Sequence, residues 1–324
     1  MRFRHFAIGA GVTTLATLSL LSCRESDSGM PTSEAVVSTG EHSDALPVAP
    51  GEMESPVRIA VGKKGRLFVS DFFLRVVFEL EAGADGARVE RALAIPGRPL
   101  GVAWAGGNRL IVGNASTQSV DVYRAKNGKW LYSLGGPGAV KDPTDIAVDR
   151  RRRLAFVLDG YAQTVRVFAL RDGSPLHTIS APGPGDHYLQ HPTGIAVDPA
   201  RREVLVSDYG EPTYADSPPA VKIFRYNGTH VKTISGQAGM LGQRFSRPQG
   251  LAVDGAGRIL VVDALAGEVL VLDRETGDVL QTLGSLGSGP GELWLPLDVV
   301  VNRELQVFVT NNRPRRVEVF QLGG

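Results

Sequence analysis

A short pattern recurs six times along this chain, and it constrains the fold more than any other feature. Each copy starts at a proline, runs through an apolar stretch and a turn, and enters a second apolar stretch that ends in aspartate or asparagine. The copy "PQGLAVDGAGRILVVD" shows it most clearly. The copies begin at Pro56, Pro99, Pro143, Pro192, Pro248 and Pro296, spaced by 43 to 56 residues. A repeat of this length indicates stacked supersecondary units.

Each copy supplies several short strands. A third apolar run follows in every copy, such as "SVDVYR", "TVRVFA" and "AVKIFR", and five copies add a turn and a fourth run. The turns include Asn127-Gly128 and Asp172-Gly173, pairs that suit tight hairpins. No segment keeps a helical period. The sequence therefore predicts an all-β, six-bladed propeller with four antiparallel strands per blade, over residues 35–324.

The sixth copy ends at Gly324 after its third strand, which would leave an open sheet edge. Near the other end of the chain, "VVSTG" (Val36–Gly40) is similar to "LQTLG" (Leu280–Gly284), which belongs to the fourth strand of the fifth copy. We therefore expect Ala35–Gly40 to be the outer strand of the last blade, so that an N-terminal strand completes the ring.

The repeats resemble the NHL-repeat family of six-bladed β-propellers. The resemblance covers nearly all of residues 35–324. It rests on Pro-x-Gly/Asp, on first strands of the "AVD" type, on the Asp or Asn that ends the second strand, and on third strands of the "VxVF" type. It implies the fold, but that fold serves enzymes, scaffolds and nucleic-acid binders alike.

The residue that ends the second strand recurs in all six copies. It is Asp71, Asn114, Asp159, Asp208, Asp263 and Asn311. A turn must be built in every blade, whereas a catalytic or metal-binding carboxylate is usually needed once or twice. Asn also lacks the charge that a general base needs. We therefore expect these side chains to hold turns by accepting hydrogen bonds from backbone N–H groups.

The first residues predict export and lipidation. Arg2 and Arg4 precede the apolar run Phe6–Leu21, which at sixteen residues is short for a transmembrane span. The run ends in "LLSC", which resembles the lipobox of bacterial lipoproteins and contains the only cysteine, Cys23. The resemblance implies a signal peptide (1–22), a lipid on Cys23 and a flexible tether (23–34). A cleaved secretory signal with an incidental cysteine is the alternative.

These features predict a location and a class of partner. A lipidated Cys23 implies the bacterial cell envelope, and Arg24 in place of aspartate favours the outer membrane over the inner one. The net charge is +1, so the chain lacks the basic excess of nucleic-acid binders. We expect a monomeric propeller with an envelope protein or small ligand as partner, membrane contact through the lipid anchor, and no nucleic acid.

Enzymatic chemistry is the alternative. Related six-bladed propellers include amidating lyases and gluconolactonase-like hydrolases, and the lyase resemblance implies zinc-binding histidines just after the prolines. None of the matching positions here is histidine; they are Val57, Leu100, Thr144, Thr193, Gln249 and Leu297. His187 and His191 share one loop before the fourth copy. Two nearby histidines could contribute to a zinc site, but histidines in such a loop are more often solvated. We therefore predict no catalytic residue, metal or cofactor, and a binding scaffold in place of a metal-dependent lyase or hydrolase.

The predicted strand directions define two faces. The upper face contains the loops into each first strand and the turns between second and third strands. One such loop, "YGEPTYADSPPA", is long and stiffened by prolines, and its tyrosines suit partner contacts. A tolerated insertion is the alternative. The candidate binding face consists of Arg58, at the channel mouth, and Tyr209, Glu211, Tyr214, Asp216, Arg313 and Arg315.

The lower face contains the turns between first and second strands, and these turns are basic. The candidate membrane-facing residues are Lys63, Lys64, Arg150, Arg151, Arg152, Arg153, Arg201 and Arg202. The eleven-residue stretch Arg24–Glu34 spans at most about 40 Å and should join the propeller at its lower rim. We expect these loops to face the membrane; a merely solvated surface is the alternative.

Overall fold

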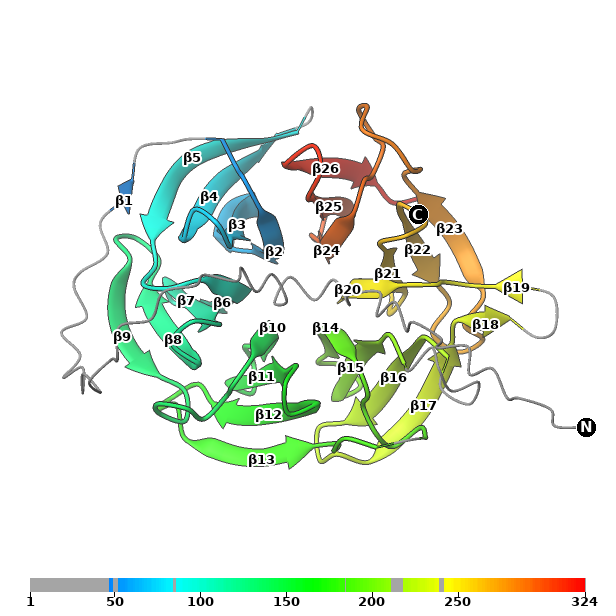
Figure 1. Cartoon of the computed structure of the whole chain (residues 1–324), viewed down its shortest axis with the longest axis horizontal. Helices are drawn as coiled ribbons and strands as arrows, with labels where there is room; N and C mark the ends of the chain where they lie inside the picture. The colour runs from blue at the N-terminus through cyan, green and yellow to red at the C-terminus, as the bar shows by residue number, and fades with distance from the viewer. Residues whose placement is uncertain are drawn as a thin grey trace, which may run out of the picture. The chain divides into compact units, whose positions relative to one another are not determined.

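The computed structural model describes residues 47–48, 52–83, 86–183, 185–210, 218–238 and 242–323. They lie in a compact unit that spans His42–Gly324. Six antiparallel sheets surround a central axis (Figure 1), so the all-β, six-bladed propeller predicted from the repeats is confirmed. Within these ranges the one helical element is the turn η1 (Lys63–Gly65), and no helix is long and apolar enough to cross a membrane.

The repeated motif forms the two strands of each blade that lie nearest the axis. The first, inner strands are β2 (Pro56–Val61), β6 (Pro99–Gly106), β10 (Pro143–Asp149), β14 (Pro192–Asp198), β20 (Pro248–Val253) and β24 (Pro296–Val301). The second strands are β3 (Arg66–Asp71), β7 (Arg109–Asn114), β11 (Leu154–Asp159), β15 (Glu203–Asp208), β21 (Ile259–Asp263) and β25 (Gln306–Asn311). Blades one to six are numbered in this order.

The remaining runs form the outer strands. The third strands are β4 (Val76–Gly83), β8 (Ser119–Arg124), β12 (Thr164–Ala169), β16 (Ala220–Arg225), β22 (Glu268–Leu272) and β26 (Arg316–Gln321). Five blades have a fourth strand: β5 (Gly86–Ala94), β9 (Lys129–Ser133), β13 (Pro175–Ile179), β17 (His230–Ser235) and β23 (Val279–Leu283). Short strand β1 (Pro47–Val48) pairs with β5, and β18 (Gln237–Ala238) pairs with β19 (Gly242–Gln243) between blades four and five.

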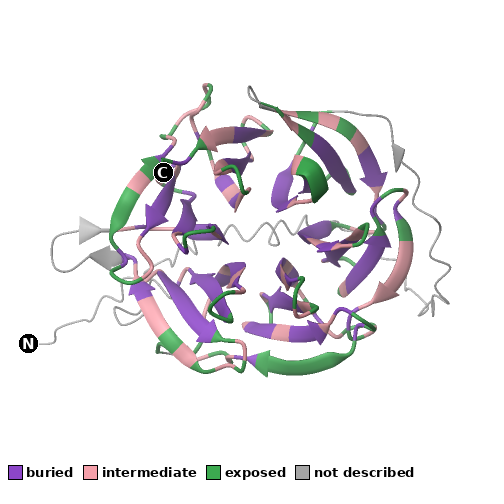
Figure 2. Ribbon diagram, turned by 180° about the vertical axis from the view of Figure 1, so that it is seen from behind, coloured by how far each residue is buried: buried purple, intermediate pink, exposed green. Residues whose placement is uncertain are grey.

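The hydrophobic core lies between the blades. It consists of six clusters, one for each pair of neighbouring blades, and the second strands are accordingly the most buried (Figure 2). The last cluster joins blade six to blade one, with Phe308 and Val317 packed among Ile59, Leu67 and Phe78. The Thr310 hydroxyl also donates to the Val57 carbonyl at 2.9 Å across the same junction. Inner strands thus close the ring.

Blade six has three strands, β24–β26, among the described residues. The expected fourth strand, Ala35–Gly40, lies outside them and stays a prediction.

The Asp or Asn that ends each second strand is buried, and in blades one to five it holds two segments of backbone, whereas the hydrogen bonds of the Asn311 side chain in blade six hold the entering loop. In blade five, Asp263 accepts from the N–H groups of Leu265 and Ala266 in the following turn, at 3.1 and 3.3 Å. It also accepts from the N–H groups of Ser246 and Arg247, in the loop that enters the blade, at 2.6 and 3.2 Å. The structural role predicted for these residues is confirmed, and the contact with the entering loop adds to it.

Replacing Asp263 with alanine should lower the free energy of unfolding by about 1 to 3 kcal/mol, because buried N–H donors lose their acceptor. Asp263→Asn should cost less but not be neutral. Both Asp263 oxygens accept hydrogen bonds, whereas in blade two the Asn114 amide nitrogen donates to the Pro96 carbonyl. Urea unfolding of both variants tests this order, and equal stability of the alanine variant and the parent would contradict it.

Candidate binding faces and the axial charge cluster

One position in each inner strand, two residues after the proline, lies beside the central axis. Its occupants are Arg58, Gly101, Asp145, Gly194, Gly250 and Asp298. The pairing register of every inner strand shifts just after the proline, which is the irregularity of a β-bulge. Glycine is required where blades approach closely: a Cβ on Gly250 would lie 2.0 Å from Asp298 Oδ1.

Arg58 crosses the axis and contacts three other blades. Its Nε donates to the Thr144 carbonyl at 3.2 Å, its Nη1 donates to the Leu297 carbonyl at 3.1 Å, and its Nη2 donates to the Thr193 carbonyl. Arg58 as a whole is only 3% exposed to solvent. The sequence placed Arg58 at the channel mouth as a binding residue; the structure corrects this, because a guanidinium engaged by inward-pointing carbonyls is buried inside the channel.

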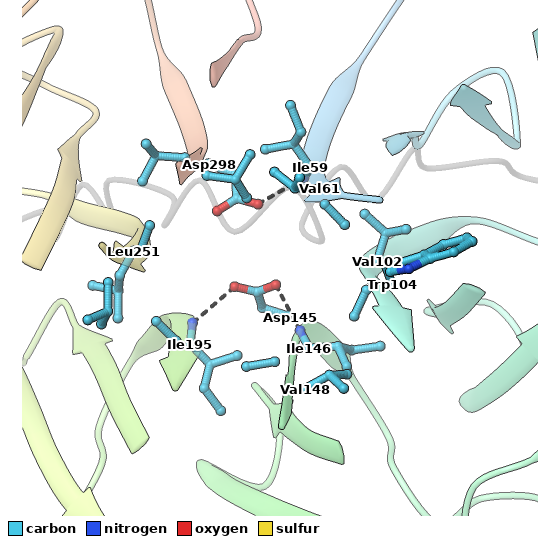
Figure 3. Close-up of a pocket in the computed structure, with 18 of the residues that line it drawn as sticks. Ile59, Val61, Val102, Trp104, Asp145, Ile146, Val148, Ile195, Leu251 and Asp298 are labelled. Carbon is cyan, nitrogen blue, oxygen red and sulfur yellow. Dashed lines mark hydrogen bonds between the residues drawn. The ribbon is translucent and has the colours of Figure 1, made fainter. Parts of the chain in front are cut away.

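Two carboxylates accompany this guanidinium. Arg58 Nη1 lies 3.9 Å from Asp145 Oδ2 and 3.7 Å from Asp298 Oδ1. Each carboxylate also joins neighbouring blades: Asp145 accepts from the Ile195 N–H at 3.0 Å, and Asp298 accepts from the Ile59 N–H at 2.9 Å (Figure 3). We call Arg58, Asp145 and Asp298 the axial cluster. Its hydrogen bonds connect blades one, three, four and six.

Burial changes the charge state of the axial cluster. Removal from water, together with the negative charge of Asp145, raises the pKa of Asp298 to about 8, although the charge of Arg58 partly offsets these two effects. Burial likewise raises the pKa of Asp145, again opposed by Arg58. Because the pKa of Asp298 lies above neutral pH, its carboxyl is largely protonated there, and this lowers the negative charge that faces Arg58.

A cavity of about 230 Å³ lies on the axis beside this cluster. Inner-strand residues line it, including Val61, Trp104 and Val301, together with Asp145 and Asp298, which face each other in Figure 3. Arg150, from a lower-face turn, also lines it, so the cavity extends toward the lower face.

Metal-binding geometry is not found in the described part of the chain, where no group of three or more His, Cys, Asp or Glu residues could hold an ion. The two histidines of the blade-four loop have separate contacts. His187 meets the His230 ring edge-on at 5.0 Å between centroids, and His191 Nδ1 lies 2.7 Å from the Gly210 carbonyl.

Exposed aromatic and aliphatic side chains gather on the upper face. Tyr161 is 71% exposed and Phe73 57%, both in turns between second and third strands, and Trp294 is 46% exposed in the loop into blade six. The other large exposed apolar residues of this face are Leu74, Tyr188, Leu265 and Leu286. The remaining large exposed apolar residues lie on fourth, outermost strands; they are Leu176, Val231, Val279 and Leu280. None of the described ones lies on the lower face.

Cations stack on three aromatic rings of the upper face, of which Tyr161 is exposed, Tyr209 is half-buried and Phe72 is buried. Arg98 lies over the Phe72 ring at 5.2 Å, Lys141 over Tyr161 at 4.7 Å, and Arg247 over Tyr209 at 5.5 Å. Such stacking stabilises a cation without neutralising it.

The candidate binding residues are distributed as follows. Tyr209 is half-buried on the upper face, and Arg313 and Arg315 are exposed there, with no ion pair to another described residue. Glu211, Tyr214 and Asp216 lie outside the described residues, as does Cys23. The sequence pattern did not indicate Phe73, Tyr161 and Trp294. For Phe73 a signal was present, because apolar residues directly follow a turn-forming Asp in "DFFLR".

Many lower-face cations form no ion pair with another residue that the structure describes. The turn-forming carboxylates neutralise one arginine each: Asp149 pairs with Arg152 at 2.8 Å, and Asp198 pairs with Arg201 at 3.0 Å. The other predicted basic residues are exposed, and no ion pair joins them to described residues; they are Lys63, Lys64, Arg150, Arg151, Arg153 and Arg202.

Comparisons with known proteins support the fold. No protein-family model and no curated protein matches this chain. Hydrazine synthase from Kuenenia stuttgartiensis is similar in structure, with a TM-score of 0.61, 15% sequence identity, and coverage of 88% of this chain and 99% of that chain. A chain of the nidogen/laminin complex has a TM-score of 0.58 and 17% identity, over 79% of this chain and 93% of that one. At these identities the likeness establishes a propeller fold alone.

Proposed function

We propose that this chain is an NHL-type propeller lipoprotein of the bacterial envelope that binds a partner protein through its upper face. One observation carries the proposal: the large exposed aromatic residues concentrate on the upper-face turns and loops, where three cations also stack on aromatic rings. Aromatic residues and arginine supply most of the binding energy in protein interfaces. The lipobox-like sequence before Cys23 supports lipid anchoring, and the six repeats support the NHL relationship.

The rigidity of the platform also supports binding. Phe73 and Tyr161 extend from turns that buried carboxylates hold in place: Asp71 accepts from the Leu74 N–H at 3.0 Å, and Asp159 from the Ala162 N–H at 3.1 Å. Side chains on such turns lose little conformational entropy when a partner orders them. The alternative of a metal-dependent lyase or hydrolase has no comparable observation in its favour, since Arg58 itself fills the axial site with a cation.

Photo-crosslinking in the native envelope tests the proposal. A benzoylphenylalanine residue at Tyr161 or Phe73 should form a discrete adduct with one envelope protein. The same residue at Leu280, which is 54% exposed on the outer strand β23, is the matched control for exposure.

Further substitution at the same face should remove the adduct. With the crosslinker at Tyr161, the changes Phe73→Ser and Trp294→Ser should reduce the yield several-fold, because anchor residues act together. Adducts that form equally at Leu280, or that survive these changes, would overturn the proposal.

A further inference from the structure

We infer that the lower face binds the anionic surface of a lipid bilayer by electrostatic attraction alone. The inference concerns the face opposite the proposed partner site and goes beyond partner binding. The sequence already predicts that the basic loops of this face lie toward the membrane. The structure shows which cations are already neutralised, which are not, and what else the face contains.

The turns between first and second strands carry a large excess of positive charge. Asp149, Asp198 and Asp254 are each paired with an arginine of their own turn, at 2.7 to 3.0 Å, and Arg66 is paired with Glu79. The remaining cations have no ion pair with any described residue: Lys63, Lys64, Arg109, Arg150, Arg151, Arg153, Arg202 and Arg303. Glu304 is the one unpaired carboxylate in the described part of these turns.

Three of these cations occupy backbone positions that disfavour them. Lys64, Arg153 and Arg202 have φ values of 59°, 56° and 57°. This left-handed conformation is costly for residues with a Cβ and suits glycine and asparagine. The corresponding turns of blades five and two use Gly257, at φ 89°, and Asn108, at φ 64°. In three blades a cation therefore stands at a position where glycine or asparagine would fold more easily, and in blade six Leu305, at φ 60°, has the same conformation.

The character of the face favours a bilayer over a nucleic acid. Every large exposed apolar residue in the described ranges belongs to the upper face or to an outer strand. The lower face thus offers no aromatic platform for stacking bases. The cations lie on turns of blades one, two, three, four and six around one end of the channel, and Arg150 reaches the axial cavity. A broad ring of charge matches a planar array of phosphates, and without apolar anchors the attachment should be reversible and sensitive to salt.

Vesicle sedimentation tests this surface. The protein would be the chain from Arg24 onward, which lacks the lipidated cysteine but retains the whole compact unit His42–Gly324. It should sediment with vesicles that contain phosphatidylglycerol at low ionic strength, and not with pure phosphatidylcholine. Binding by the unmodified chain should fall steeply as salt is added, a readout that depends on no variant.

A matched pair of triple variants locates the site. Changing Arg150, Arg151 and Arg153 to glutamate should weaken binding by about two orders of magnitude, since each basic residue near an anionic surface contributes about a factor of five. Changing Arg75, Arg313 and Arg315 to glutamate alters the net charge equally on the upper face and should have little effect. None of these six arginines makes an ion pair within the described residues, so melting temperatures should match the parent's.

Three outcomes would overturn the inference. The first is no binding to anionic vesicles at low salt, and the second is equal loss of binding in both triple variants. The third is tight binding to heparin or single-stranded RNA, reduced by the lower-face variant, without binding to vesicles. Crosslinking at the upper face is a separate measurement, so either proposal can fail while the other stands.

Discussion

Replacing Arg58 with methionine is expected to lower the free energy of unfolding by about 3 to 5 kcal/mol, the cost of removing one partner from a buried charge pair. The guanidinium is the only cation within 4 Å of Asp145 and Asp298 among the described residues, and it satisfies three carbonyls that face the channel. Methionine fills a similar volume but leaves a buried carboxylate without a counter-charge. Urea unfolding at neutral pH measures the loss.

Two further variants separate charge from volume. Arg313→Met removes an exposed arginine and should stay within about 0.5 kcal/mol of the parent. Combining Arg58→Met with Asp145→Asn and Asp298→Asn removes all three ionisable groups and should restore most of the lost stability, because buried charge networks can be replaced by neutral groups at little cost. If Arg58→Met is as stable as Arg313→Met, or if the combined variant is no better than Arg58→Met alone, the axial cluster does not hold the ring.

The repeats alone predict the fold because every blade solves the same folding problem with the same residues. The Asp or Asn at the end of each second strand recurs six times, and this recurrence separates turn formation from catalysis. The inner strands, their partners and the blade count follow from the same alignment. The connection of blade six to blade one through Phe308 and Val317 does not, because it depends on packing between opposite ends of the chain.

The axial cluster is a departure from the repeat, and such departures are harder to interpret. Arg58, Asp145 and Asp298 occupy one repeat position that is glycine in the other three blades. Because equivalent positions surround one axis, aligned repeats would bring these charges together. Considered alone, Arg58 is an ordinary arginine near a predicted loop, and the sequence pattern therefore places it at the channel mouth. The aromatic residues of the upper face were missed for a different reason: the exposure of a turn residue depends on neighbouring loops that do not repeat.

The free energy of unfolding is expected to fall as the pH rises from about 4 to about 8, and Asp298→Asn should remove a large part of this dependence. The folded protein holds the pKa of Asp298 at about 8, whereas the ordinary value is 3.8. A carboxyl with a raised folded pKa binds a proton more tightly in the folded state, so its stabilising contribution is complete below the ordinary pKa. The contribution is lost as the pH rises through the folded pKa, by an amount of several kcal/mol for a fully buried group.

Other carboxyls titrate as well. Burial, together with the charge of Asp159, raises the pKa of Asp142 to about 6, which adds to the loss of stability with rising pH, whereas Asp149 acts in the opposite direction at lower pH. Burial acts to raise the pKa of Asp149, but the hydrogen bonds from the Arg152 side chain and backbone N–H and from Tyr226 outweigh it and hold the pKa below its ordinary value. Its stabilising contribution is therefore lost as the solution becomes acidic, below the window that concerns Asp298. Asparagine at 298 resembles the protonated acid and keeps an oxygen that can accept from the Ile59 N–H. Asp145→Asn is the paired comparison, because the two carboxyls titrate together and either amide removes their mutual repulsion.

Urea unfolding of the parent and both amide variants across this pH range decides the matter. The parent should lose stability with rising pH relative to either variant. Arg58→Met should destabilise the protein more at the alkaline end than at the acidic end, because the buried carboxyl that it leaves without a counter-charge is then ionised. A parent and an Asp298→Asn variant with parallel pH profiles would mean that Asp298 is ionised throughout, and that Arg58 balances two charges instead of one.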